Sequence, residues 1–456
     1  HQTNYNTLKA SYWSFLEGDL SPECFVQPTN AQEVSTVIKI LNKPEYRNVE
    51  SCKFAIKSGG HLTYAGAANI EGGVTIDLAK MKEVAVSPDQ KWVSLGPGNN
   101  WREVYTKIEP MGLAVTGGRW GNVGVGGYLL GGVDGIYNHE VVLADGSIIN
   151  ANNTANQDLH KVLKGGNNNF GIVTRFDMKA YPVGNIWGGT IAGVPGRANL
   201  PMKWFEEYAS PRNADPNGMI MLNFNYMLGT WSHSSFITYA KNVTTTPACF
   251  SGLANSSMLN AVFPTSYLAV AQRNELMTYM GGRSLMATFS YVNSAAYMDK
   301  LLDLAASFSS SLPFLSGLIL IFQPLWTTSR QKSFKVHGGN ILGLDEHSDD
   351  VVIVLVQTGW LTAASDEAVN QAVQLFIEKA GKLAKEMGTY SPYVYANYAA
   401  GFQSPMEGYG PKSMALMKAA SKKYDPAQLF QERLPGGFKL GGSYQSRMKQ
   451  NKGSSH

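Results

Sequence analysis

The chain has 456 residues, of which 44% are hydrophobic and 16% charged, and it contains 47 glycines. This length exceeds the size at which one hydrophobic core keeps growing, so the sequence predicts a compact enzyme of two interlocked domains and not a disordered or fibrous chain. The net charge of +4 comes from scattered residues, and no apolar stretch is long enough to cross a bilayer, so we expect neither nucleic acid nor a membrane as a partner.

The first 182 residues are predicted to form a mixed α+β domain. Apolar residues recur at helical spacing over 31–41, after a cap at Thr29 or Asn30. Further short runs are typical of strands and are separated by glycine-rich turns. These runs cover residues 54–56, 74–78, 92–95, 141–143 and 172–176. We therefore assign residues 1–182 to the first domain.

Longer elements follow in residues 183–390, which are predicted to form a substrate-binding domain. Apolar and polar residues alternate over 219–228, as in a half-buried antiparallel strand. Runs over 286–292 and 351–357 are expected to add strands to the same sheet. The fold class is therefore α+β, with a large antiparallel sheet flanked by helices in the second domain.

One long helix and the end of the chain complete the predicted organisation. Residues 366–387 carry the apolar stripe of an amphipathic helix, with Ser365 as its cap and Gly388 as its terminator. Residues 391–450 are expected to return to the first domain, and residues 451–456 have the composition of a tag remnant.

Three cysteines occur, and none has the spacing of a zinc or thioredoxin-like site, so no metal is expected. Cys24 precedes a predicted helix and Cys52 precedes a predicted strand, so a disulfide between them could tie down the start of the fold, at a gain on the order of 3 kcal/mol. The alternative is that both are buried free thiols. Cys249 is predicted to stay free.

Glycosylation sequons begin at Asn152, Asn242 and Asn255, and each is a weak signal by itself. Together they favour a secreted protein. The absence of a signal peptide at His1 is typical of a mature chain whose leader has been removed. We expect an extracellular protein, acting as a monomer.

Three glycine-rich segments dominate the first domain: residues 57–61 (KSGGH), 117–127 (GGRWGNVGVGG) and 165–171 (GGNNNFG). Glycines let several backbone N–H groups converge on an anion such as pyrophosphate, so a large phosphate-bearing cofactor is the expected ligand. Glycines that serve only tight turns would explain one such segment more easily than three. A Rossmann site is excluded because Leu129 stands where its third glycine would be.

Together these segments resemble the vanillyl-alcohol oxidase and berberine-bridge-enzyme superfamily, in which the first domain has the p-cresol-methylhydroxylase-type fold and binds FAD. The resemblance covers nearly the whole chain, and its fungal branch is indicated by residues 338–344 (GGNILGL). The other matching segments are residues 24–29 (CFVQPT), 57–61, 117–132, 141–146 (VVLADG), 163–174, 424–426 (YDP) and 435–438 (PGGF).

In relatives the histidine of the Gly-Gly-His element is bonded to the 8α-carbon of the flavin, so the resemblance implies covalent FAD at His61. A neutral imidazole is a nucleophile, and a covalent tether typically makes the flavin a stronger oxidant. The other residues expected to contact FAD are Lys57, Ser58, Gly59, Gly60, Gly117, Gly118, Arg119, Gly124, Gly126, Gly127, Val141, Gly171, Ile172, Val173 and Asn397.

Many relatives attach the flavin a second time through a cysteine, and this sequence has Val133 at the matching position. A single attachment is therefore expected. Relatives also carry extra loop residues between Gly132 and Val133. Either the loop is shorter in this protein, which would open the pocket, or residues are missing from this sequence.

The resemblance also implies the chemistry: a base takes a proton from a small alcohol-type substrate, hydride passes to the flavin, and O2 reoxidises the flavin to give hydrogen peroxide. Tyr398 is the leading candidate for the base, although it could equally be a packed aromatic; His139 and His337 are weaker candidates. Val141 matches a position where relatives with a small residue let oxygen reach the flavin. Two alternatives remain, an oxidative cyclase of secondary metabolism and a flavin- or sugar-binding protein without turnover.

Overall fold

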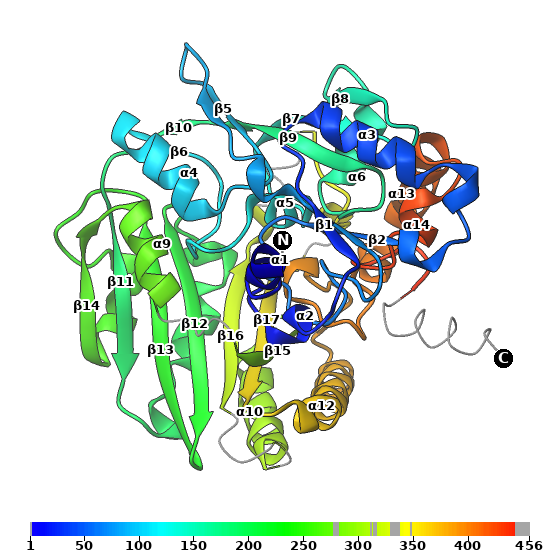
Figure 1. Cartoon of the computed structure of the whole chain (residues 1–456). Coiled ribbons are helices and arrows are strands. Elements are labelled where there is room, and N and C mark those ends of the chain that lie inside the picture. The colour runs from blue at the N-terminus through cyan, green and yellow to red at the C-terminus, as the bar shows by residue number, and fades with distance from the viewer. Residues whose placement is uncertain are drawn as a thin grey trace.

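The computed structural model describes residues 2–276, 282–310, 312, 317–328, 338–346 and 349–442. They form two halves, each built on its own sheet system, with a separate hydrophobic core in each half (Figure 1). The α+β class and the large antiparallel sheet predicted from the sequence are confirmed.

The first half, over residues 2–182, contains sheets of three, five and two strands and six α-helices. In the three-stranded sheet β1 (Cys24–Val26) and β2 (Phe54–Lys57) pair in parallel with β3 (Val74–Asp77), which lies between them. The five-stranded antiparallel sheet has the order β4 (Val84–Val86), β5 (Trp92–Leu95), β9 (Ile172–Lys179), β7 (Ile136–Val142) and β8 (Ile148–Asn152). Two short strands, β6 (Leu113–Ala114) and β10 (Tyr181–Pro182), pair with each other. The helices are α1 (Gln2–Lys9), α2 (Phe15–Gly18), α3 (Ala31–Leu41), α4 (Trp101–Ile108), α5 (Val125–Leu130) and α6 (Gln157–Leu163).

The second half is an eight-stranded antiparallel sheet with helices against it. Its strand order is β14 (Ser257–Thr265), β11 (Ile186–Gly193), β13 (Thr230–Tyr239), β12 (Gly218–Met227), β16 (Leu318–Leu325), β17 (Val351–Trp360), β15 (Arg283–Val292) and β18 (Tyr390–Ser391). The helices in this part are α7 (Met202–Tyr208), α8 (Ser251–Asn255), α9 (Tyr267–Leu276), α10 (Ala295–Ser309) and α12 (Asp366–Glu386). Side chains of α10 and α12 pack with one face of the sheet in a single core cluster.

After β18 the chain packs against the first half. Helices α13 (Gly410–Tyr424) and α14 (Leu429–Glu432) lie beside α3 and α6, although hundreds of residues separate them in sequence (Figure 1). Met417 and Phe438 belong to the same core cluster as Trp101 of α4. The end of the chain therefore helps to build the core of the first half.

Several predicted element ends agree with the structure. Helix α3 covers residues 31–41 as predicted, and the Asn30 side chain accepts a hydrogen bond from the Glu33 N–H. Helix α12 ends before Gly388, which has a φ of +69°. Ser365 is the N-cap residue of α12 as predicted, but its side chain makes no capping hydrogen bond.

The predicted disulfide between Cys24 and Cys52 is also wrong, since all three cysteines are free. The strand order explains this result. Cys24 on β1 and Phe54 on β2 both pair with Val74 of β3, so they lie two strand spacings apart, or about 9–10 Å. Cys52 precedes Phe54 by two residues, whereas bridged Cα atoms lie within about 7 Å.

None of the described helices is both long and apolar enough to span a membrane.

Candidate functional site

A cavity of about 1030 Å³ lies between the two halves of the molecule. Loops of the first half, including Gly59 and Gly118, form one wall, and the eight-stranded sheet forms the other with residues such as Met221 and Leu355. Ligand sites usually measure about 300–1,000 Å³, so this cavity has room for a ligand of dinucleotide size.

Two of the glycine-rich loops touch each other at the cavity wall, backbone against backbone. A Cβ atom added to Gly59 would lie 2.5 Å from the Cα of Gly124, and one added to Gly124 would lie 2.4 Å from the Gly59 nitrogen. The Ser58 hydroxyl joins the loops further by donating to the Pro97 carbonyl at 2.6 Å and accepting from the Gly126 N–H at 3.1 Å. Only glycine fits at this contact.

The second glycine loop lies flat on an aromatic base. A Cβ atom at Gly117 or Gly118 would lie within 2.6 Å of the Trp101 ring. The hydroxyls of Tyr128 and Tyr105 donate to the carbonyls of Gly117 and Gly118 at 2.9 and 2.7 Å. The loop is thereby fixed through its carbonyls, on the side away from its N–H groups.

Four backbone donors on these loops lack an acceptor. Within the part of the chain that the structure describes, the N–H groups of Gly59, Gly60, Gly117 and Gly118 make no hydrogen bond. All four residues line the cavity. Converging backbone N–H groups of this kind form a site for an anion such as a phosphate.

His61 lies at the cavity wall with its ring stacked on Trp13, at 4.8 Å between ring centroids. Its Nε2 is buried and has no hydrogen-bond partner in the described chain. Burial lowers the pKa of His61 from the ordinary 6.5 to about 4, against smaller opposite effects of its own backbone and of the neighbouring Asn122. The imidazole is therefore neutral at pH 7 and has a free nitrogen lone pair or N–H.

The segment around α2 holds the loop that follows His61. The buried Glu17 carboxyl accepts hydrogen bonds from the backbone N–H groups of Gly66 and Ala68 at 3.0 and 2.6 Å. Burial raises the pKa of Glu17 to about 8, even though these hydrogen bonds lower it. The Trp13 N–H also donates to the Gly60 carbonyl at 3.0 Å, so this segment fixes the position of the imidazole.

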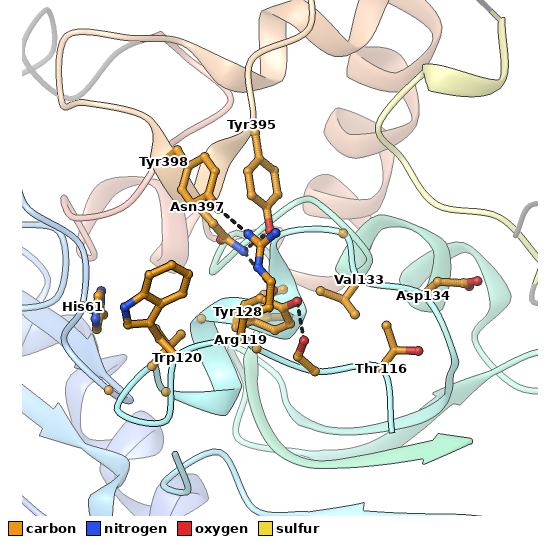
Figure 2. Close-up of a pocket in the computed structure, with 18 of the residues that line it drawn as sticks. His61, Thr116, Arg119, Trp120, Tyr128, Val133, Asp134, Tyr395, Asn397 and Tyr398 are labelled. Atoms are coloured by element: carbon orange, nitrogen blue, oxygen red, sulfur yellow. Dashed lines mark hydrogen bonds between the residues drawn. The ribbon is translucent and has the colours of Figure 1, made fainter. Parts of the chain in front are cut away.

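Arg119 connects three separate parts of the chain across the cavity (Figure 2). Its Nη2 donates to the Tyr398 hydroxyl at 2.8 Å and to Oε1 of Gln323 at 2.6 Å. The amide of Gln323, on β16, is also within 3.2 Å of the Tyr398 hydroxyl. These hydrogen bonds hold the Tyr398 hydroxyl in a fixed position beside a cation and an amide.

Asn397 joins the C-terminal segment to the end of α5. Its Nδ2 donates to the Tyr128 carbonyl and to the Tyr395 hydroxyl, each at 3.0 Å. The amide also lies against Gly131, where an added Cβ would come within 2.3 Å of it. These contacts set where the neighbouring Tyr398 enters the cavity.

Comparison with known proteins is consistent with this geometry. A model of the FAD binding domain family matches residues 22–152. The chain is 32% identical to the FAD-dependent monooxygenase drtC of Aspergillus calidoustus, over 96% of this chain and 86% of that protein. This chain belongs to the berberine-bridge-like FAD-linked oxidoreductases of the vanillyl-alcohol oxidase superfamily.

Solved structures of this superfamily have the same fold. The berberine-bridge-like protein 1 of Physcomitrella patens aligns over 96% of this chain and 95% of its own, with a TM-score of 0.75 at 18% identity. Glucooligosaccharide oxidase from Acremonium strictum, a protein with a 6-S-cysteinyl, 8α-N1-histidyl FAD, aligns over 92% of each chain, with a TM-score of 0.73 at 15% identity.

Within this FAD-linked fold, the structure brings nearly all of the predicted site residues to one cavity. All of them except Lys57 and Val141 line it. The lining residues are Ser58, Gly59, Gly60, His61, Gly117, Gly118, Arg119, Gly124, Gly126, Gly127, Gly171, Ile172, Val173, Asn397 and Tyr398. The Arg119 guanidinium contacts Tyr398 and Gln323, which indicates a role toward the substrate side and not only toward the cofactor.

Lys57 and Val141 require correction as cofactor contacts. The Lys57 ammonium is buried behind the loop, 2.7 Å from Ser11 Oγ and 3.6 Å from the Asp77 carboxylate, because the strand alternation of β2 turns it away from the cavity. Val141 is fully buried, and its Cγ1 would lie 2.5 Å from a Cβ at Gly171. Val141 therefore supports the wall formed by Gly171 from behind.

The weaker candidates for the base do not reach the cavity. His139 is buried in the first half, and its Nδ1 lies 3.0 Å from Nδ1 of His160. Burial lowers the pKa of His139 well below its ordinary value. His337 lies outside the described residues.

Val133 and Asp134 occupy the side of the cavity away from His61 and Trp120 (Figure 2). The Val133 side chain cannot form a bond to a flavin. Among the described cavity residues no cysteine is present, so His61 is the candidate for covalent attachment.

Sequence reasoning missed two residues that line the cavity, Gln323 and Trp120, and also Asn122, which neighbours His61. The Nε1 of Trp120 and both polar atoms of Asn122 are buried without a hydrogen-bond partner in the described chain. Trp120 and Asn122 lie inside the glycine segment 117–127, and that position was an available signal. Gln323 lies on β16 with no motif around it, so only the pairing of strands could reveal it.

Proposed function

We propose that this FAD-dependent oxidoreductase holds its FAD through a single covalent bond to His61 and oxidises a small-molecule substrate with O2 as the electron acceptor. The orphaned Nε2 of His61, in a neutral imidazole at the wall of a dinucleotide-sized cavity, is the observation that carries the proposal. When bound, FAD supplies the acceptor for hydride and returns the electrons to oxygen.

The glycine loops fit the cofactor by their backbone. The unpartnered N–H groups of Gly59, Gly60, Gly117 and Gly118 would hold the pyrophosphate, because no side chain stands between them and the cavity. Arg119 adds a positive charge near the same wall.

Tyr398 is proposed as the base that takes the substrate hydroxyl proton. Arg119 and Gln323 would both donate to the phenol oxygen and so hold it in position for the proton transfer. In the complete reaction the substrate loses two electrons and two protons to become a carbonyl compound, and O2 gains both to become hydrogen peroxide.

The test is acid precipitation of the purified protein, followed by peptide mass spectrometry and a peroxide assay. We expect flavin to stay with the polypeptide on the peptide containing His61, and one peroxide to form per substrate oxidised. Flavin in the supernatant would refute the covalent bond.

Relatives such as drtC are named monooxygenases, which makes oxygen insertion the second candidate function. Turnover under ¹⁸O2 separates the two. Oxidation of an alcohol to a carbonyl leaves no ¹⁸O in the product, whereas a monooxygenase leaves one atom there.

Secretion and glycosylation form a separate part of the proposal. Asn242 and Asn255 are exposed, whereas Nδ2 of Asn152 donates to Asn138 at 3.0 Å. In protein purified from a glycosylating fungal host, we expect glycans at Asn242 and Asn255 and none at Asn152. Unmodified peptides at both exposed sites would contradict this part.

A further inference from the structure

Helix α9 belongs to the second half of the chain but is held against the first half, beside the cavity (Figure 1). At the start of α9 the Leu268 N–H donates to the Glu109 carboxylate at 2.8 Å. Near its end the Glu275 carboxylate accepts from the Arg102 guanidinium at 2.8 Å. Arg102 lies on α4, and Glu109 follows that helix directly. Contacts at both ends of α9 therefore tie the two halves together.

The middle of α9 holds the loop that carries Arg119. The side-chain amide of Asn274, which is 3% exposed, donates to the Arg119 carbonyl at 3.0 Å. The Gly121 N–H donates to the Ala271 carbonyl at 3.1 Å. A Cβ atom at Gly121 would lie 2.6 Å from a carboxylate oxygen of Glu275, so helix and loop are in direct contact there. Two points of the loop backbone are therefore fixed by a helix from the other half.

Asn274 differs from the other contacts of α9, because it acts on the residue whose side chain enters the site. Within the described chain no other group donates to the Arg119 carbonyl. The Gly121 carbonyl, by contrast, accepts from the Arg102 N–H of the first half at 2.9 Å. The position of the Arg119 backbone therefore depends on Asn274 in particular.

The residue type at position 274 argues against a packing role alone. Val270 and Ala271, three and four residues earlier on the same face of α9, are apolar and buried. Leucine or alanine would fill such a position and has a higher helix propensity than asparagine, and a buried amide is unfavourable unless it is hydrogen-bonded. The hydrogen bond to the Arg119 carbonyl gives a physical reason for an amide there.

The Arg119 side chain is held at its other end by Tyr398 and Gln323, to which its Nη2 donates at 2.8 and 2.6 Å. An arginine side chain has several rotatable bonds, and fixing it in one geometry costs conformational entropy. A shift of the backbone at Arg119 therefore changes whether the guanidinium reaches both acceptors. Arg119 is also the only Lys or Arg among the described residues that line the cavity, so no second cation there can replace it.

We infer that Asn274 is a positioning residue of this site, which holds the Arg119 backbone where the guanidinium meets the Tyr398 hydroxyl. Asn274 acts on the reaction only through Arg119, and that role in the reaction rests on the proposed function. The contact of α9 with the first half is then part of what assembles the site.

The test is ¹⁹F NMR of the full-length, flavin-loaded protein with Tyr398→3-fluorotyrosine, because the fluorine resonance reports the surroundings of the phenol. We expect Asn274→Ala to move this resonance in the same direction as Arg119→Met, by at least half of that shift. The control Gln272→Ala removes an exposed amide from the same helix and should leave the resonance unchanged.

A double-variant comparison separates positioning from a general loosening of the fold. When Arg119→Met is already present, Asn274→Ala should cause no further shift, because the two changes act through one contact. Asn274→Leu keeps the volume of the side chain without the donor, and it should shift the resonance as Asn274→Ala does. An unmoved resonance in both Asn274 variants would overturn the inference, as would an additional shift in the Arg119→Met background.

The resonances are measured without turnover, so they are independent of the chemistry proposed for Tyr398. Failure of the proposed function would appear in the peroxide assay and would leave the resonance shifts as expected. Failure of the inference would appear in the resonances alone.

Discussion

At the scale of single residues, the proposed chemistry depends on how burial and charge act on two side chains. His61 is neutral because its ring is removed from water, and its free Nε2 faces no competing partner in the described chain. Tyr398 has the opposite setting, with a guanidinium 2.8 Å from its oxygen. The first environment leaves a neutral nucleophile, and the second holds the phenol oxygen of Tyr398 in place beside a cation.

Replacing His61 by Ala should leave FAD bound but no longer covalently attached. Most of the binding energy is expected from the backbone donors and from burial, neither of which involves the imidazole. The reduction potential of the flavin should fall, and flavin reduction measured by anaerobic stopped flow should slow. Each tenfold loss of rate corresponds to a rise of about 1.4 kcal/mol in the activation free energy. Covalent flavin retained in the variant would show that another residue carries the bond.

Replacing Tyr398 by Phe should slow flavin reduction by about 10²–10⁴-fold, the usual effect of losing a general base. Covalent flavin content should not change, because the hydroxyl lies with Arg119 and Gln323 and has no contact with His61. Tyr390→Phe, at an exposed tyrosine, is the control and should react like the wild type. A normal rate in Tyr398→Phe would leave the residue with a packing role only.

At the scale of elements, the site depends on close contact between loops that only glycine permits. The loop after β2 and the loop before α5 meet at Gly59 and Gly124. This contact brings His61 and the Gly117 loop to one wall of the cavity. The loops are therefore positioned by each other as well as by the sheets.

Replacing Gly124 by Ala should lower stability by about 1–3 kcal/mol and reduce flavin content, because the new methyl group would displace the Gly59 loop. Gly381→Ala is the matched control. A Cβ at this position of α12 meets nothing within 4 Å, so that variant should be unchanged or more stable by up to about 1 kcal/mol. Thermal unfolding and flavin absorbance measure both effects. Full flavin content in Gly124→Ala would contradict the proposed contact.

The strand order β1-β3-β2 leads to a prediction about the cysteines. Because β3 separates Cys24 from Cys52, thiol counting under denaturing, non-reducing conditions should find three reactive thiols. The double variant Cys24→Ser/Cys52→Ser should keep the wild-type melting temperature within a few degrees. A count of one thiol would mean that the two cysteines are bridged.

At the scale of the whole molecule, buried histidines make the folded state sensitive to acid. Burial lowers the pKa of His61 to about 4 and that of His160 to about 3, and the pKa of His139 also falls well below its ordinary value. The unfolded chain binds these protons near pH 6.5, whereas the folded chain does not. The stability that the neutral histidines contribute is therefore present above about pH 6.5 and is lost as the pH falls toward 4.

We accordingly expect the melting temperature to fall between pH 7 and pH 4, and to fall less steeply in His160→Gln than in the wild type. Differential scanning calorimetry at several pH values measures the slope. A variant with the wild-type slope would show that other groups determine acid stability.

The local features of the fold and of the site could be predicted without the structure. The helical spacing of apolar residues predicted α3, and the three glycine-rich segments predicted one wall of the cavity. Both signals lie in consecutive residues, so they can be read without knowing the fold. His61 and Tyr398 were also found by motif. The helix and strand patterns indicated the α+β class, and the family resemblance added the p-cresol-methylhydroxylase-type fold and the expectation of FAD.

Contacts between residues far apart in the sequence could be found only in the folded protein. Strand β3 lies between the segments that carry Cys24 and Cys52. The Lys57 side chain points away from the cavity, toward Asp77, whereas the Arg119 side chain points toward Tyr398. Gln323 joined the site through the packing of β16 alone. The physical reason is that pairing partners and side-chain directions are set by burial over the whole chain, which no local pattern encodes.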